Sequence, residues 1–516
     1  MRKRPTRSRA MKFRHMVVLI GCLLGGPSIS LSTSVYAQSL ALNPATESPH
    51  WPHIKVFDYA RSLFLASLSP AEYQWYVSHL DAVEVHGNGP AVRAINPTIG
   101  LFSYQFDMSQ FQTADFSGLA ESGFLHFSED TSLTFWNLQK TQIVGSKSIK
   151  GCPDPPIPAC RVQTHLWDND RYVFDPQSAA FRTWQAAKVL GPLNAYGMSN
   201  DTSTIVWLDE HAPGFSWPLS FGYQTVIKSG GGIREFGGRR PWVNGVLDNT
   251  FETDYATALN SWLAVLASAA GTANKKLVIN ANAYSLHPWL LPQVRTVLGM
   301  STESKHRPDG FSGPAEYQQY LNLTNDLTKA GGVIDLHGTW CYTGPGGYTA
   351  GNYGTSAARY RMWRLASYYQ FKEPVGSAGT VYFNPGFCSN NSANINSAAA
   401  DQASWLLAYQ VDVGQPTGNT LLYQQGTADC AYQILGRQYT KALILVRPQD
   451  GSRCTNYGDS SAATVTFADP VQILREDGTV SGLVTTARIR NAEAIIAIQV
   501  RADIKPPVAP TLRLMK

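Results

Sequence analysis

Two acidic residues stand where an apolar, strand-like segment of the chain gives way to a loop. Asp209 follows the run at residues 204–208 (TIVWL), and Glu303 follows the run at 297–302 (VLGMST). Barrel enzymes that cleave glycosidic bonds commonly use a pair of carboxyl groups placed at the ends of the strands. We therefore interpret Asp209 and Glu303 as a candidate catalytic pair. That interpretation requires both runs to be strands of the same barrel.

The elements that would position this pair can be counted along the chain. Short apolar runs alternate with helical stretches, which predicts a parallel (β/α)8 TIM barrel rather than an open sheet. Asp209 and Glu303 would lie at the carboxyl ends of its fourth and sixth strands. The expected strands are 54–59, 82–87, 100–107, 203–210, 277–284, 297–303, 331–338 and 380–386. The expected helices are 70–79, 178–192, 253–270, 286–296, 314–329 and 355–371, whereas 91–96 is a poor helix candidate.

Two connections are longer than a compact barrel needs. Residues 108–177 follow the third expected strand, and residues 211–250 follow the fourth. Both run from a strand to a helix and emerge on the carboxyl-terminal face of a barrel, where active sites are built. We expect them to line the site.

The pattern of apolar and polar residues changes after residue 415. Short β runs separated by turn signals predict a small antiparallel β-sandwich domain. We expect a signal peptide at 1–37, the barrel at 50–415, the β domain at 416–503 and a tail at 504–516.

The first residues read as a secretion signal. Seven basic residues lie between Arg2 and Arg14, a short apolar run follows, and Val35-Tyr36-Ala37 resembles a cleavage site. The run at 19–22 that ends in Cys22 also fits a lipoprotein processing site, but apolar residues continue beyond it, so we favour a cleaved signal. No apolar stretch is long enough for a transmembrane segment. We therefore expect a secreted or periplasmic protein.

The charge balance depends on this leader. Removing its seven bases from the 42 basic residues leaves 35, against 37 acidic residues. The mature chain is close to neutral, and nothing in it indicates a nucleic-acid partner. Its oligomeric state cannot be deduced from the sequence.

Six cysteines remain once Cys22 leaves with the signal. No Cys-x-x-Cys or Cys/His spacing supports a zinc site, so disulfides in an oxidising compartment are the better interpretation. Neighbourhood in the sequence favours three pairs: Cys152–Cys160, Cys341–Cys388 and Cys430–Cys454.

With leader, barrel and β domain in place, the chain resembles the glycosyl-hydrolase-like TIM-barrel proteins secreted by bacteria. This hypothetical glycosyl hydrolase family 15-like group is related to the endo-α-1,4-polygalactosaminidases. The matching motifs are residues 55–58 (KVFD), 94–97 (AINP) ahead of 101–104 (LFSY), and 205–209 (IVWLD). The resemblance implies a polysaccharide-cleaving barrel with Asp209 as nucleophile and Glu303 as general acid/base. It implies no cofactor.

One ambiguity concerns the fourth strand, where Glu210 adjoins Asp209. Strand residues alternate between two faces, so only one of these acids points inward on a regular strand. With Asp209 inward, Trp207 also faces the interior while Val206 and Leu208 face the helices. With Glu210 inward, the arrangement is reversed. We favour Asp209 because it matches the family motif, and we keep Glu210 as its substitute.

Other polar and aromatic residues near strand ends are candidates for binding an oligo- or polysaccharide substrate, although strand-end acids also commonly cap the next helix. These candidates are Asp58, Glu84, Tyr104, Gln105, Asn280, Asn282, Asp335 and Trp340.

Two other functions remain open. A carbohydrate-binding barrel without catalysis would need no second acid at hydrolytic distance from the first. A metal-dependent polysaccharide esterase would need clustered histidines. His86, His126, His211 and His337 lie in different segments without metal-binding spacing, so we predict no metal site.

Overall fold

The structure is a computed structural model. It describes residues 54–58, 69–85, 88–106, 109–111, 114–137, 142–166, 169–198, 200–201, 203–209, 211, 214–215, 231–243, 246–280, 288–302, 305–308, 310–337, 357–385, 405–450, 454 and 456–500. The expected signal peptide with Cys22 and the expected tail at 504–516 lie outside these residues.

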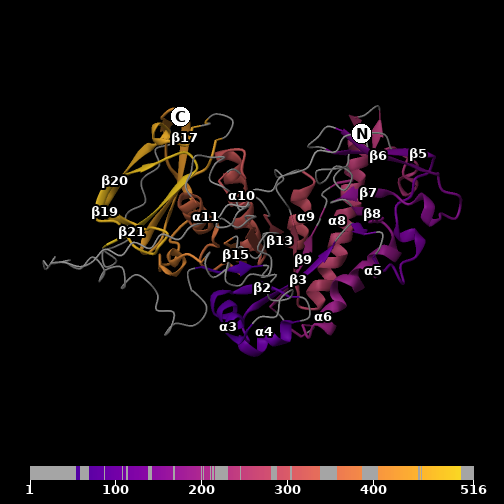
Figure 1. The fold of residues 1–516 in the computed structure, drawn as a ribbon, viewed down its shortest axis with the longest axis horizontal. Helices are drawn as coiled ribbons and strands as arrows, with labels where there is room; N and C mark the ends of the chain where they lie inside the picture. The colour runs from indigo at the N-terminus through magenta and orange to yellow at the C-terminus, as the bar shows by residue number, and fades with distance from the viewer. Residues whose placement is uncertain are drawn as a thin grey trace, which may run out of the picture.

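Eight parallel strands form a closed barrel, as the alternation of apolar runs predicts (Figure 1). Their order is β1 (Phe57–Asp58), β2 (Ala82–Glu84), β3 (Gly100–Phe106), β9 (Thr204–Asp209), β12 (Lys276–Asn280), β13 (Gly299–Ser301), β14 (Val333–His337) and β15 (Thr380–Asn384). A parallel bridge between Val56 and Phe383 joins the last strand to the first. The Phe383 N–H donates to the Lys55 carbonyl across that seam at 2.7 Å.

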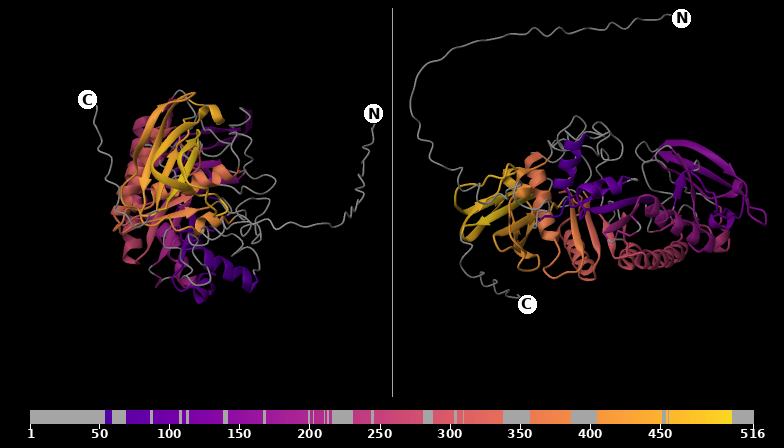
Figure 2. Two further views of the ribbon diagram at one scale, coloured as in Figure 1. Left: turned by 90° about the vertical axis from the view of Figure 1, so that its left-hand side faces the viewer. Right: turned by 90° about the horizontal axis from the view of Figure 1, so that it is seen from below.

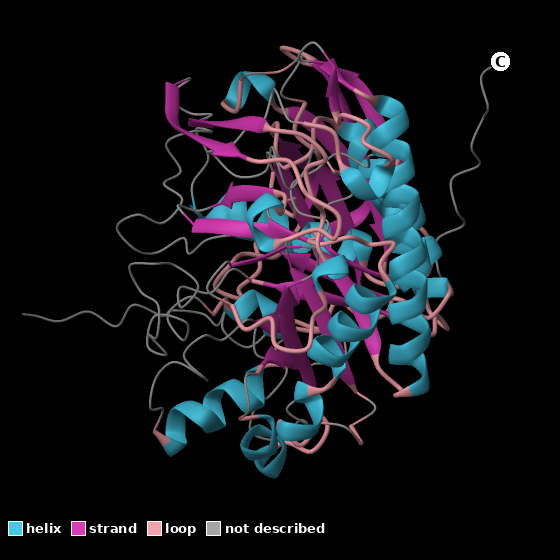
Figure 3. Cartoon of the chain, turned by 90° about the vertical axis from the view of Figure 1, so that its right-hand side faces the viewer, coloured by secondary structure: helices cyan, strands magenta, loops and turns pink. Residues whose placement is uncertain are grey.

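Helices lie outside the barrel strands (Figure 3). They are α3 (Pro70–His79), α4 (Gly89–Ile95), α5 (Ala179–Leu190), α6 (Pro192–Ala195), α8 (Asn249–Thr272), α9 (Leu290–Val297), α10 (Pro314–Lys329) and α11 (Ala357–Phe371). The prediction of α10 is confirmed at both ends. The long α8 begins earlier than predicted because Asp248 caps it, accepting from the Thr250 N–H at 2.8 Å. A short helix, α4, also forms where the sequence is a poor helix candidate.

Side-chain alternation divides the barrel into two apolar layers. The interior cluster contains Phe57, Ala82, Phe102, Ile205, Trp207, Val278 and Val333. The alternate residues, such as Val206 and Leu208, belong to the larger cluster shared with the helices. The expected orientation of the fourth strand, with Trp207 inward, is therefore confirmed.

The connection after β3 folds into an insertion, which we define as residues 109–173. It contains β4 (Ser109–Phe111), β5 (Thr131–Asn137), β6 (Gln142–Ile149), β7 (Gln163–Leu166) and β8 (Asn169–Val173), with 3-10 turns η1 (Glu121–Gly123) and η2 (Pro158–Cys160). Strands β4, β8 and β7 make one antiparallel sheet, and β5 and β6 make a hairpin. The insertion and the β domain lie at opposite ends of the molecule (Figures 1 and 2).

The second long connection, which follows β9, contacts the insertion. It carries η3 (Arg234–Phe236), β10 (Trp242–Val243) and β11 (Val246–Leu247). An isolated bridge pairs Phe127 with Ile233, and the Arg234 N–H donates to the His126 carbonyl at 2.9 Å. The two connections therefore form one unit beside the barrel.

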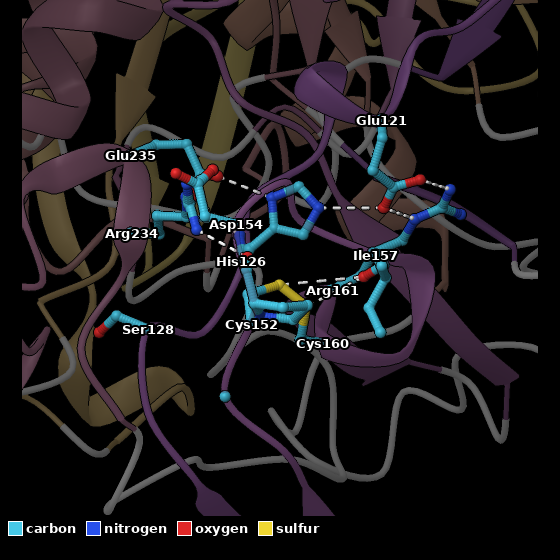
Figure 4. The surroundings of a disulfide bond; sticks show 12 residues. Glu121, His126, Ser128, Cys152, Asp154, Ile157, Cys160, Arg161, Arg234 and Glu235 are labelled. Carbon is cyan, nitrogen blue, oxygen red and sulfur yellow. Dashed lines mark hydrogen bonds and ion pairs between the residues drawn. A yellow bond between two sulfur atoms is a disulfide. The ribbon is translucent and has the colours of Figure 1, made fainter.

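His126 links the two connections because its imidazole contacts a carboxylate from each of them (Figure 4). Its side chain is fully buried, with Nδ1 2.6 Å from Glu235 Oε1 and Nε2 3.0 Å from Glu121 Oε1. Arg161 also binds Glu121. The charges of Glu235 and His126 act on the buried carboxyl of Asp175. Burial lowers the pKa of His126, but the hydrogen bonds and charges of Glu235 and Glu121 outweigh it and leave this pKa raised. The imidazolium form is thus favoured.

The β domain is a single six-stranded antiparallel sheet that curls over its own core. Its order is β16 (Leu421–Thr427), β17 (Ala431–Gln438), β18 (Ala442–Arg447), β21 (Glu493–Gln499), β19 (Ala463–Ile473) and β20 (Val484–Ile489). Tyr423 on edge strand β16 donates its hydroxyl to the Thr466 carbonyl on β19 at 2.9 Å, which closes the curl. The antiparallel β domain is confirmed, and its two layers come from one sheet.

The β domain is fixed to the barrel through the end of α11. The last carbonyls of a helix have no partner within the helix. The buried guanidinium of Arg437, on β17, donates to the carbonyls of Tyr369 and Gln370 at 3.0 Å each. The Gln370 side chain in turn donates to the Ile444 carbonyl on β18 at 2.7 Å.

Two of the three predicted disulfides are present. Cys152–Cys160 closes a loop of the insertion, with Cα atoms 5.3 Å apart (Figure 4). Cys430–Cys454 ties the β16–β17 turn to the segment after β18, with Cα atoms 5.4 Å apart. Cys341 and Cys388 lie outside the described residues.

The bridge at His126 predicts a pH-dependent stability. Because the folded pKa is raised, the contribution of His126 is fully present below the ordinary histidine value and is lost as pH rises through the folded pKa. We expect His126→Gln to lower the free energy of unfolding by about 2 kcal/mol near pH 6, and by less at pH 8.5. Thermal unfolding across pH 5.5–9 measures this.

The matched control is Lys150→Met, which removes an exposed ion pair with Asp130 in the same insertion. It should change stability little at any pH. A His126→Gln deficit that stayed constant from pH 6 to 8.5 would contradict the charged bridge.

Candidate functional site

Polar side chains collect on the inner surface of the barrel at the carboxyl ends of its strands. Residues paired across neighbouring parallel strands point to the same face, so the register identifies the inward row. Asp209 stands two residues after the inward-facing Trp207 and faces the same interior. The inward row ends in Glu84, Tyr104, Asp209, Asn280, Ser301, Asp335, His337 and Asn384.

Asp209 is held by its two neighbouring strands. The Tyr104 hydroxyl on β3 donates to Asp209 Oδ2, and Asn280 Nδ2 on β12 donates to Oδ1 at 2.7 Å. The Tyr104 ring packs on Trp207, with ring centroids 5.1 Å apart. Asp209 itself is only half-buried. Each carboxylate oxygen thus has a fixed donor, and the group remains accessible from the barrel mouth.

Asp335 sits in a different environment. It is fully buried, Ser301 Oγ donates to its Oδ2 at 2.9 Å, and the Thr302 N–H donates to its backbone carbonyl at 2.9 Å. These bonds join β13 to β14 at the point where β13 ends. This places Asp335 beneath the rim, where it supports the segment that leads toward residue 303.

The histidines at this end of the barrel are neutral. Burial, together with the nearby Arg364 guanidinium, holds the pKa of His337 well below its usual range. Burial and Arg364 likewise hold the pKa of His306 well below its usual range, and His337 lowers it further. His306 Nε2 lies 3.0 Å from Ser367 Oγ on α11. His306 is thereby joined to α11.

The structure brings some of the predicted site residues together and separates others. Glu84, Tyr104, Asp209, Asn280 and Asp335 share the inward row. Asp58 pairs with Val83 and Gln105 with Leu208, so these two side chains lie on the row that faces the helices. Their predicted role in binding substrate stays a prediction. Glu303, Glu210, Asn282 and Trp340 lie outside the described residues.

Of the four histidines considered as metal ligands, the three that the structure describes lie in different parts of the fold. His126 belongs to the insertion, and His211 is buried against Gln293 of α9 at 2.7 Å. His337 ends β14, and His86 lies outside the described residues. Within the described ranges, no three His, Cys, Asp or Glu side chains gather as a metal-binding group.

Sequence reasoning missed one residue that acts electrostatically on this site, Arg171. It lies on β8 of the insertion and is only 2% exposed. Burial lowers the pKa of its guanidinium to about 10, and the negative charge of Asp209 acts in the opposite direction. Asp209 is therefore near a buried cation from outside the barrel. No motif could have revealed it, because the electrostatic link between Arg171 and Asp209 depends on the fold of the insertion.

Two further features complete the description. A surface groove of about 840 Å³ lies on the outside of α8, and none of the described rim residues lines it. Of the helices that the structure describes, none has the length and hydrophobicity of a membrane span.

No protein-family model and no curated protein matches the chain. Among solved structures, it is similar to an alpha-amylase from Geobacillus thermoleovorans complexed with acarbose, at 8% identity and a TM-score of 0.40, covering 87% of this chain and 98% of that one. It is also similar to Aspergillus fumigatus Ega3 complexed with galactosamine, at 10% identity and a TM-score of 0.31, covering 68% and 94%.

A third similar structure is a cycloisomaltooligosaccharide glucanotransferase from Paenibacillus sp. complexed with cycloisomaltoheptaose. Here the identity is 8%, the TM-score is 0.31, and the alignment covers 86% of this chain and 54% of that one. The chain thus spans about half the length of that protein. Such identities and scores do not assign the chain to a family.

The contact between Asn280 and Asp209 predicts a pH-dependent defect in Asn280→Asp. Two carboxyl groups at hydrogen-bonding distance cannot both ionise, so one would keep a proton in the folded state. We expect near-normal stability at pH 4.5 and a loss of about 2 kcal/mol at pH 8, because a raised acid pKa removes stability as pH rises. Denaturant unfolding at both pH values measures this.

Asn280→Ala is the control for loss of the hydrogen bond alone. It should cost about 1 kcal/mol at both pH values. If Asn280→Asp behaved like Asn280→Ala at every pH, the two side chains would not be in contact.

Proposed function

We propose that the protein is a secreted glycoside hydrolase that cleaves a polysaccharide with two carboxyl groups. The observation that carries this proposal is the setting of Asp209. It ends the fourth strand of a parallel barrel, remains accessible from the mouth, and has both oxygens oriented by Tyr104 and Asn280. In a barrel of this kind, the carboxyl-terminal face is where catalytic groups stand.

Asp209 is assigned the role of nucleophile. A carboxylate that attacks an anomeric carbon must be ionised and held in one orientation. Hydrogen bonds donated by Tyr104 and Asn280 favour the negative form of the group. Glu210, its neighbour in sequence, is the substitute candidate.

Glu303 is assigned the role of general acid/base. It follows β13, the sixth strand of the barrel, and its neighbour Thr302 is bonded to the Asp335 carbonyl on β14. In the first step Asp209 would bond to the anomeric carbon while Glu303 protonates the departing oxygen. In the second, water would give a proton to Glu303 and displace Asp209. This retaining course requires carboxyl groups about 5–5.5 Å apart.

Substrate binding is assigned to the other rim groups, among them Glu84 and Tyr104. These polar side chains suit sugar hydroxyls, and Trp340 is proposed as a stacking surface. Secretion is supported by the disulfides Cys152–Cys160 and Cys430–Cys454, since such bonds persist in oxidising compartments.

The test is a panel of polysaccharides offered to the purified mature protein, with release of reducing ends as the measurement. We expect at least one polymer to be cleaved. Asp209→Asn and Glu303→Gln should each lower kcat by about 10³-fold or more on that polymer, with the fold intact. Proton NMR of the first product identifies the anomer and so separates retention from inversion.

Asp130→Asn is the matched control, because it removes an exposed carboxylate of the insertion that is paired with Lys150. It should leave turnover unchanged. Binding of a polymer without cleavage would favour a carbohydrate-binding barrel, and deacylation lost on chelation would favour an esterase. Full turnover in both Asp209→Asn and Glu303→Gln would reject the carboxylate pair.

A further inference from the structure

The surface groove beside α8 is bounded by two helices and a turn, and none of the described rim residues lines it. Its walls come from α5 and α8, which lie side by side, and from the turn η3 (Figure 1). Phe181 of α5 packs on Trp262 of α8 with ring centroids 5.3 Å apart, and Phe236 of η3 packs on Phe251 of α8 at 4.9 Å. All four rings are buried, so the three walls are fixed to one another.

The lining of this groove of about 840 Å³ is polar. The residues of α8 that line it, Asp254, Thr257, Ala258 and Ser261, recur at helical spacing and so lie on one face of the helix. Of the described residues that line the groove, only Ala258 and the buried Phe236 have hydrocarbon side chains. Sites for apolar ligands are lined mainly by apolar side chains. The groove therefore suits a hydrophilic ligand.

The two carboxylates of the lining already have cationic partners. Glu235 Oε1 lies 2.6 Å from His126 Nδ1, and Glu235 Oε2 accepts from the His126 N–H at 2.8 Å (Figure 4). Asp254 Oδ2 lies 2.5 Å from Arg239 Nη2. Because His126 and Arg239 balance these negative charges, neither carboxylate repels an anionic ligand as a lone carboxylate would.

Arg182 of α5 brings a positive charge to the groove with donors that a ligand can use. Its Nε donates to the Pro176 carbonyl at 2.7 Å, which fixes the side chain near the start of α5. Its charge acts on the buried carboxyl of Asp175, but within the described part of the chain no hydrogen bond or ion pair engages Nη1 or Nη2. These two atoms carry most of the N–H groups of a guanidinium. Most of the donors of Arg182 are thus available.

The hydroxyls of α8 are available as acceptors. Thr257 Oγ1 donates to the Thr253 carbonyl at 2.7 Å, and Ser261 Oγ donates to the Thr257 carbonyl at 3.0 Å. Because each hydroxyl gives its hydrogen to the helix, its lone pairs remain to accept from a ligand. Thr257 and Ser261 are exposed and one helical turn apart. With the exposed amide of Gln177, they complement the hydroxyl groups of a sugar.

We propose that the groove is a second carbohydrate-binding site, in which Arg182 binds the carboxylate of an acidic sugar unit while Thr257 and Ser261 bind its hydroxyls. A guanidinium matches a carboxylate with two parallel hydrogen bonds. Peptides commonly bind at a strand edge or in an apolar groove, whereas these walls are two helices and a turn with a polar lining. The inference goes beyond the proposed function, because the groove needs no catalytic group.

The test is isothermal titration calorimetry in an Asp209→Asn background, which removes the proposed nucleophile and leaves the groove unchanged. The probes are tetramers of galacturonate, mannuronate and guluronate, each compared with its uncharged methyl ester. We expect at least one acidic tetramer to bind with a Kd of about 0.1–1 mM. Its ester should bind about tenfold or more weakly, and Arg182→Gln should weaken binding of the acid by a similar factor.

Lys188→Gln is the matched control. It removes one positive charge from the same helix, where Lys188 lies 3.8 Å from Asp115 and does not line the groove. The Kd should not change. Ser261→Tyr fills the groove without altering its charge and should abolish binding, and the exposed position of Ser261 favours an intact fold. If near-ultraviolet circular dichroism shows that Arg182→Gln does not fold, Ser261→Tyr decides the question.

Undiminished binding in both Arg182→Gln and Ser261→Tyr, or no binding of any acidic tetramer, would overturn the proposal. Pentaglutamate is the comparison ligand, and binding of this peptide that depends on Arg182 and is at least as tight would assign the groove to acidic peptides instead. A polymer cleaved by the wild type without binding at Arg182 would overturn this inference alone. Binding that depends on Arg182, with no polymer cleaved, would uphold the second site and reject the proposed function.

Discussion

Closure of the barrel is the constraint from which the site follows. Once the Val56–Phe383 bridge joins β15 to β1, every strand has one face inside and one face toward the helices. Side chains alternate strictly along a strand, so a shift of one residue would exchange the two sets. The position of Trp207 in the interior cluster therefore fixes the orientation of Asp209, and the parallel register places Tyr104 and Asn280 beside it. No local feature of residue 209 could achieve this by itself.

Much of this arrangement could be predicted from the sequence because its causes are local. The apolar run before Asp209, the proline at the start of α10 and the short spacing of Cys152 and Cys160 each act within a few residues. The eight strands, most of the helices and two disulfides were predicted for that reason. The inward row at the rim was predicted only in part. Asp58 and Gln105 were grouped with it, although the register places them toward the helices.

The parts that could not be predicted depend on contacts between distant segments. Arg437 meets the end of α11 across more than sixty residues of chain. His126 meets Glu235 across more than one hundred. Buried charges of this kind have no periodic signature, because a single residue at any point in a loop can provide them. The curl of the β domain is similar, since the Tyr423–Thr466 contact closes it only after the strands have paired.

The charges at the rim connect the barrel with the insertion. The inward row contains three acids, Glu84, Asp209 and Asp335, on strands of one small barrel. Like charges in a partly desolvated site oppose ionisation, and the neutral donors Tyr104 and Asn280 orient Asp209 without neutralising it. The hydrogen bonds from these two donors favour the ionised form of Asp209, and the buried guanidinium of Arg171 on β8 acts on it electrostatically. The His126 bridge and the Cys152–Cys160 disulfide then have a function beyond the insertion, because they stabilise the unit that holds this guanidinium in place.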